Sequence, residues 1–205
     1  MNWVEGVNMD KGTKALYEEI ISCKVCEAVL PEGVNPVLTI DNRSKILIIG
    51  QAPGMKVHRS GIPWNDQSGR ELRNWLGVTE DEFYNPKNFS ILPIGFCYPG
   101  RGKSGDLPPR SECAPLWHER VLAELQQVRL TLLIGQYAQS YYLKKDKCKT
   151  LTATVGNYKN YLPRYFPLPH PSPRNFIWMS KNSWFKEEVV PNLQKLVSQI
   201  LYTPG

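Results

Sequence analysis

The chain has 205 residues, enough for one well-buried core and too few for two ordinary domains, so we expect a single domain over residues 1–205. Its 41% hydrophobic and 21% charged residues exclude a disordered polyelectrolyte. No apolar run is long enough to cross a bilayer, and residues 1–12 lack a secretory signal, so we expect a cytoplasmic protein with no membrane partner. A net charge of +6 permits a nucleic-acid partner, although many proteins without one are equally basic.

The order of apolar runs predicts strands that alternate with helices. A first helix is expected over residues 13–22, with Thr13 as its N-cap, and Cys23 to Cys26 then form a tight turn. Short β-branched runs predict four strands, over residues 45–50, 89–94, 130–135 and 165–168. Further helices are expected up to Leu76 and over residues 112–127, 137–143 and 184–201. This alternation predicts a three-layer α/β/α fold around a central, mainly parallel four-stranded sheet.

The loop after the first predicted strand has the composition of a base-binding loop. It begins with GQAPG over residues 50–54 and continues with GIPWND over residues 61–66. Glycine permits close backbone approach, and Trp64 beside the rigid Pro63 offers a flat surface on which a nucleobase can stack. An ordinary turn and a core position for Trp64 are the alternatives.

A second distinctive loop, HPSPRN over residues 170–175, follows the last predicted strand. Ligands of parallel sheets bind beyond the carboxyl ends of the strands, so two loops at those ends can share one pocket. We therefore expect Trp64 and His170 to face each other across a slot. The alternative for His170 is a hydrogen-bonded structural histidine.

Four of the five cysteines form two pairs. Cys23 and Cys26 make a CxxC motif, and Cys97 and Cys113 bracket a basic loop rich in proline and glycine. Cysteines of a cytoplasmic chain are more often metal ligands or core thiols than disulfides. Structural zinc usually binds two short knuckles, so the wide pair suits zinc less well. Cys148 has no partner in the pattern and is expected to be a free thiol.

These features resemble the uracil-DNA glycosylase superfamily. GQAPG followed by GIPW is similar to motif one of the family-four enzymes, and HPSPRN is similar to motif two of the single-strand-selective monofunctional glycosylases. The cysteine spacing also resembles that of family four, whose cysteines bind a [4Fe–4S] cluster. The resemblance implies that Cys23, Cys26, Cys97 and Cys113 ligate such a cluster, which would join the N-terminal helix to the 97–113 loop. Zinc in the same site remains the alternative.

The resemblance implies a role for each residue of the two loops. Trp64 would stack on a flipped base, and backbone groups at Gly50, Gln51 and Ala52 would contact it. His170 would donate a hydrogen bond to the base as the N-glycosidic bond breaks.

The same resemblance implies a DNA-binding face around the base pocket. Arg174 would fill the space that the flipped nucleotide vacates, and Ser172 would contact a phosphate. Further DNA contacts are expected from Asn175, Arg101, Lys103 and Arg110, although a solvated loop would also explain the last three charges.

The chain departs from the family at motif one, where neither Gln51 nor Ala52 is the acid that handles water. The nearest replacement is Asp66, with His58 as a second candidate; a helix cap and a surface position are their alternatives. Residues 91–96 lack the Asn with which uracil-reading members hold the base.

The function expected is that of a monofunctional DNA glycosylase, a monomer that flips a deaminated, uracil-like base and hydrolyses its N-glycosidic bond in base-excision repair. Gln51 or Asp66 would handle water. The substrate could equally be hypoxanthine or xanthine. One alternative is a non-catalytic iron–sulfur DNA-binding protein of the same fold. A weaker one is a zinc-stapled α/β protein that acts on nucleotides or another small ligand.

Overall fold

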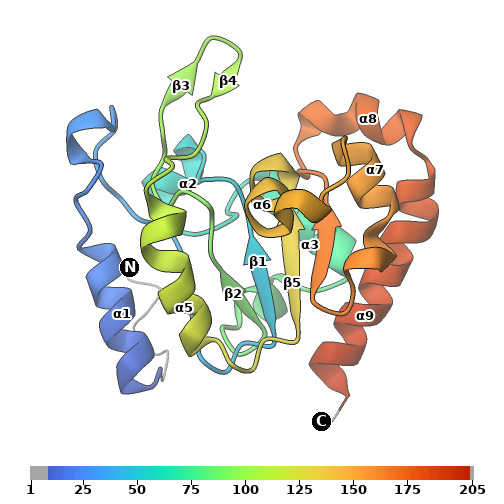
Figure 1. Ribbon diagram of the computed structural model, residues 1–205, viewed down its shortest axis with the longest axis horizontal. Helices are drawn as coiled ribbons and strands as arrows, with labels where there is room; N and C mark the ends of the chain where they lie inside the picture. The colour runs from blue at the N-terminus through green and yellow to red at the C-terminus, as the bar shows by residue number, and fades with distance from the viewer. Residues whose placement is uncertain (1–8, 204–205) are drawn as a thin grey trace.

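The computed structural model describes residues 9–203, so the first eight and last two residues of the predicted domain lie outside the described part. Four strands form one parallel sheet in the order β2-β1-β5-β6. They are β1 (Ile46–Ile49), β2 (Phe89–Ile91), β5 (Leu130–Ile134) and β6 (Tyr165–Leu168). Helices lie on both sides of this sheet (Figure 1), and the predicted α/β/α architecture is confirmed.

The helices are α1 (Lys11–Ile21), α2 (Met55–Ser60), α3 (Gln67–Leu76), α4 (Glu80–Tyr84), α5 (Glu119–Glu124), α6 (Gly135–Leu143), α7 (Leu151–Gly156), α8 (Phe176–Lys181) and α9 (Val190–Tyr202). Wide π-helical turns, Ala114–His118 and Phe185–Val189, precede α5 and α9. The predicted helices 112–127 and 184–201 therefore each contain a π-helical segment followed by an α-helix.

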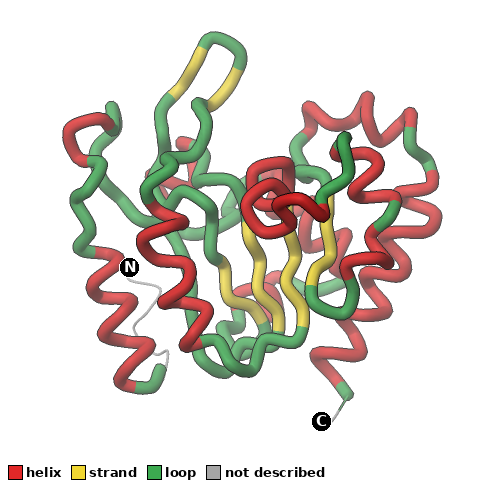
Figure 2. The backbone as a smooth tube through the Cα atoms, in the orientation of Figure 1, coloured by secondary structure: helices red, strands yellow, loops and turns green. Residues whose placement is uncertain are grey.

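Both faces of the sheet are buried, because alternate strand residues point to opposite sides. Ile46 and Ile48 belong to the core that includes α3 and α9, whereas Leu47 and Ile49 belong to the core that includes α1 and α5. A strand buried on both faces is apolar throughout, and this is the pattern from which the strands were predicted. Figure 2 shows the sheet enclosed between these two helical layers.

The first helix starts earlier than predicted. Asp10 is its N-cap, since its carboxylate accepts hydrogen bonds from the backbone N–H groups of Gly12 at 2.9 Å and Thr13 at 3.1 Å. Thr13 lies inside the first turn, where its hydroxyl donates to the same carboxylate. The prediction of Thr13 as the cap is wrong, because an acid three residues earlier satisfies the free N–H groups instead.

A small hairpin stands on the 97–113 loop, where only irregular chain was expected. β3 (Arg101–Gly102) and β4 (Gly105–Asp106) pair antiparallel and project from the body of the molecule near the carboxyl ends of the strands (Figure 1). No helix within residues 9–203 is long and apolar enough to cross a membrane.

Candidate functional site

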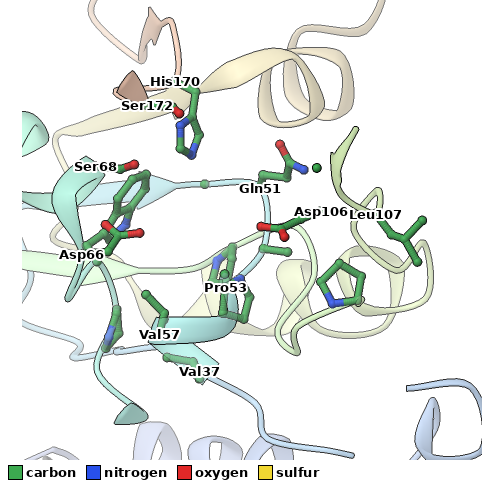
Figure 3. Close-up of a pocket in the computed structure, with 18 of the residues that line it drawn as sticks. Val37, Gln51, Pro53, Val57, Asp66, Ser68, Asp106, Leu107, His170 and Ser172 are labelled. Carbon is green, nitrogen blue, oxygen red and sulfur yellow. The ribbon is translucent and has the colours of Figure 1, made fainter. Parts of the chain in front are cut away.

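A pocket of about 510 Å³ opens beyond the carboxyl ends of the parallel strands, where α/β proteins bind ligands (Figure 3). Both distinctive loops line it, and so does the hairpin. Of the site residues expected from the sequence, those that line it are Gly50, Gln51, Ala52, Trp64, Asp66, His170, Ser172, Arg174 and Asn175. Segments far apart in the chain therefore share one cavity, as predicted.

Trp64 and His170 are in contact within this pocket. Their ring centroids are 5.6 Å apart and the ring planes are inclined by 32°. A base sandwiched between two rings needs about 7 Å, two contacts of about 3.5 Å each. The expected slot with an indole on one wall and an imidazole opposite is thus corrected: the two rings contact each other and leave no room for a base between them.

His170 is neutral at pH 7. Burial lowers its pKa below the ordinary value of 6.5, and the carboxylates of Asp66 and Asp106 oppose that shift only in part. A neutral imidazole carries one N–H, which can donate a hydrogen bond to an oxygen that gains negative charge.

Two glycines make room for Trp64. Its φ of 58° lies in the left-handed region, which is unusual for an aromatic residue. A Cβ on Gly69 would lie 1.7 Å from the Trp64 carbonyl oxygen, and one on Gly50 would lie 3.1 Å from the indole Cζ2. Gly50 was expected to admit a ligand, but in the structure its near neighbour is the indole. Gly69 was missed, because only the fold places it behind Trp64.

The HPSPRN loop is held by its own polar groups. The Asn175 side-chain amide donates to the His170 carbonyl at 2.6 Å, and the Ser172 hydroxyl accepts from the Arg174 backbone N–H at 3.3 Å. The Arg174 guanidinium donates to the Ser104 carbonyl at the hairpin tip, also at 3.3 Å. Motif two and the hairpin therefore meet at the mouth of the pocket.

The two candidates for water handling differ in position. Asp66 lines the pocket and is also the N-cap of α3, since its carboxylate accepts from the Gly69 N–H at 2.8 Å. His58 lies outside the pocket: it is buried, with Nε2 3.2 Å from the Glu32 carbonyl and its ring against Tyr98. The unpredicted helix α2 turns Val57 toward the pocket and His58 away from it. This corrects both the water-handling role of His58 and its surface alternative.

The basic residues of the hairpin do not line this pocket. Arg101 lines an adjoining hollow together with Arg174, and Lys103 is exposed near the hairpin tip. Asp106, at the end of β4, does line the pocket, and sequence reasoning missed it. A signal existed, because Asp106 is the one acid between Cys97 and Glu112.

Four cysteines converge at a second, mostly apolar cavity. Cys23 and Cys26 from the end of α1 meet Cys97 and Cys113 from the base of the hairpin loop, and Arg110 lies beside them. No three His, Cys, Asp or Glu side chains among residues 9–203 meet closely enough to hold a single metal ion. Four cysteine thiolates are the donor set of both a [4Fe–4S] cluster and a structural zinc ion.

Burial sets the protonation of two of these cysteines. Burial raises the pKa of Cys97 to about 11 and that of Cys113 to about 12, so these thiols keep their protons unless a metal takes the sulfur. Arg110 faces both the Glu112 carboxylate and the Cys26 sulfur, and they raise its pKa. Its positive charge would offset that of bound thiolates. Cys148 is a free thiol, with its sulfur 3.5 Å from the Tyr161 hydroxyl.

Comparison with known proteins adds independent findings. Residues 38–194 match the family model described as the uracil DNA glycosylase superfamily. The Type-4 uracil-DNA glycosylase of Sulfurisphaera tokodaii is 24% identical over 177 residues, which cover 77% of this chain and 73% of that protein. The solution NMR structure of a proposed uracil DNA glycosylase from Methanosarcina acetivorans matches with a TM-score of 0.44 and 17% identity, over 78% of this chain and 98% of that one.

Proposed function

Because the chain belongs to the uracil-DNA glycosylase superfamily, we propose that it is a monofunctional DNA glycosylase that removes a deaminated, uracil-like base in base-excision repair. The observation that carries the proposal is the contact between Trp64 and His170 in one pocket, because it brings an aromatic surface and a hydrogen-bond donor to the same ligand. DNA is the substrate, and the protein acts as a monomer.

The roles of the pocket residues follow from the negative charge that develops on the departing base. A flipped base enters the pocket against Trp64, and the backbone at Gln51 and Ala52 contacts its polar edge. When the N-glycosidic bond breaks, the bonding electrons leave on the base. The neutral His170 then donates its N–H to the base oxygen that takes up this charge.

The pocket composition favours hydrolysis over lyase chemistry. A lyase needs an amine that attacks the sugar, and no lysine occurs among the described residues that line the pocket. Among the described residues, none is hydrogen-bonded to the Gln51 side chain, so its amide is free to read the base edge in place of the missing Asn.

We also propose that Cys23, Cys26, Cys97 and Cys113 hold a [4Fe–4S] cluster. Their convergence on one cavity supports this, as does the similarity to a Type-4 enzyme. When bound, the cluster would supply a rigid structural link and no step of the hydrolysis. That link fixes the base of the hairpin, whose Arg101 and Lys103 then face DNA phosphates.

A base-release assay tests the proposal. Purified protein is incubated with single- and double-stranded DNA that contains uracil, hypoxanthine or xanthine, and the free base is measured. We expect release of at least one base, reduced about 10²- to 10³-fold by His170→Ala, the usual effect of losing one such donor. An unchanged melting temperature of the variant would show that folding is not the cause. Selective lesion binding without release would favour the non-catalytic alternative.

A further inference from the structure

Water must be activated for hydrolysis, and motif one of this chain has no carboxylate for that task. Two carboxylates line the pocket within the described residues, those of Asp66 and Asp106. They come from different segments, since Asp66 precedes α3 and Asp106 ends β4. In Figure 3, Asp66 lies on the side of the pocket that carries Ser68, whereas Asp106 lies near Gln51 and Pro53 of the motif-one loop.

Asp66 already has a structural task. Its Oδ1 accepts the Gly69 N–H at 2.8 Å and thereby caps α3. Gly69 is also the residue that makes room for the Trp64 carbonyl. The position and hydrogen bond of Asp66 are thus explained by the start of the helix.

The carboxylate of Asp106 is held at one oxygen and left open at the other. The hydroxyl of the buried Tyr98 donates to Oδ1 at 3.2 Å. Oδ2 accepts no hydrogen bond from a described residue, and it lies 3.7 Å from the place that a Cβ on Gly54 would occupy. This oxygen therefore stands against Gly54 of the GQAPG loop, in the same loop in which the family carries its motif-one acid.

The hairpin that carries Asp106 is fixed over the pocket. The Arg174 guanidinium donates to the Ser104 carbonyl, and it packs so closely on Gly105 that a Cβ there would lie 2.4 Å from Nη1. Motif two thus holds the hairpin that presents the acid.

From this geometry we propose that Asp106 is the catalytic carboxylate of the reaction, delivered from the hairpin in place of the motif-one acid. The inference rests on the proposed function. A water molecule bound to Oδ2 attacks C1′ of the sugar, so the water oxygen–C1′ bond forms while the C1′–N bond breaks and its electron pair leaves on the base. The proton of the water passes to Asp106 and then to the departing base, and no further reactant is needed.

Single-turnover base release on the best substrate of the lesion panel tests the role. Asp106→Asn keeps the shape and the Tyr98 contact but removes the charge. We expect its rate to fall about 10²- to 10⁴-fold, the usual contribution of a general base. Binding of the same DNA should be unchanged or tighter, because a negative charge near phosphates has been removed. The conservative Asp106→Glu should recover part of the rate.

Two further variants complete the test. Asp146→Asn, an exposed acid outside the pocket, is the matched control, and its rate should stay within about twofold of the wild type. Asp66→Asn keeps a capping side chain and tests the competing acid. A full rate for Asp106→Asn, or a larger loss for Asp66→Asn, would overturn this assignment while leaving the proposed function intact. No base release by the wild-type protein from any lesion would overturn both.

Discussion

Gly69 lies directly behind the Trp64 carbonyl, so closely that no other residue type fits there. A Cβ on Gly69 would be 1.7 Å from that oxygen and 2.9 Å from the Trp64 Cβ. The start of α3 and the aromatic wall of the pocket therefore share one close contact. Trp64 keeps its left-handed backbone because Asp66 and Gly69 place the helix immediately beneath it.

Gly69→Ala should lower the free energy of unfolding by about 1–3 kcal/mol, the usual cost of overpacking. Helix propensity alone favours alanine by up to about 1 kcal/mol, so the expected sign is opposite to that of an ordinary helical glycine. Urea unfolding measures the change, and base release should fall with it because Trp64 moves. Gly156→Ala is the control, since its Cβ would meet Trp184 at an ordinary 3.6 Å. Equal stability changes at the two sites would contradict the steric argument.

The strands and the two loops were predictable because they obey local rules. Ile46–Ile49 is apolar throughout since both faces of β1 are buried, and a short, uninterrupted apolar run in the sequence predicts such a strand. HPSPRN could be placed at the pocket because ligand loops follow the carboxyl ends of parallel strands. That Trp64 and His170 lie in one pocket followed from topology, but the contact between their rings did not, because an open slot between them was expected.

The features that could not be predicted are short elements and contacts that only the tertiary fold creates. The helices α2, α7 and α8 have six residues each, too few to display an apolar period. Because α2 was not predicted, His58 was expected to reach the pocket, whereas the helix turns it away. The hairpin has two residues in each strand, too few to show a strand pattern, so the single acid in a basic loop was the one local indication for Asp106.

Salt dependence should identify the residues that contact phosphates. Removing one phosphate contact reduces the slope of log affinity against log salt by about 0.9 for duplex DNA and about 0.7 for single strands. We expect such a reduction for Arg174→Ala and for Lys103→Ala, measured by fluorescence anisotropy at several salt concentrations. Lys159→Ala should leave the slope unchanged, because Lys159 is paired with Glu188. If the first two variants have the same slope as the wild type, Arg174 and Lys103 do not contact phosphates.

Cluster ligation can be tested by serine substitution of single cysteines. Anaerobically purified wild-type protein should be brown and contain about four iron and four sulfide per chain. Cys97→Ser and Cys113→Ser should lose visible absorption, iron and several degrees of melting temperature. Cys148→Ser should lose none of these, because Cys148 lies outside the four-cysteine cavity, near Tyr161. A colourless, folded wild-type protein that contains zinc would show that zinc, and not an iron–sulfur cluster, occupies the site.

Stability below neutral pH should depend on another buried histidine, His118. Its Nε2 lies 3.0 Å from the Pro93 carbonyl, its Nδ1 lies 2.7 Å from the Tyr142 hydroxyl, and Tyr141 is the other titratable group against its ring. Burial lowers the pKa of His118 from 6.5 to about 4. Pro93 lines the pocket, so this histidine also supports the strand end at which the base would bind.

The sign of the pH effect follows from which state binds the proton. Between pH 6.5 and about 4 the unfolded chain protonates His118 while the folded protein keeps it neutral, so stability falls as the pH falls. The slope contributed by this group is at most about 1.4 kcal/mol per pH unit, or about 3 kcal/mol over the interval. Urea unfolding at several pH values should therefore show a shallower slope for His118→Gln than for the wild type, even though the variant is less stable at pH 7. His170 is shifted in the same direction and remains in both proteins, so the difference between the two curves isolates His118. Parallel curves would mean that His118 takes up its proton in the folded state as readily as in the unfolded one.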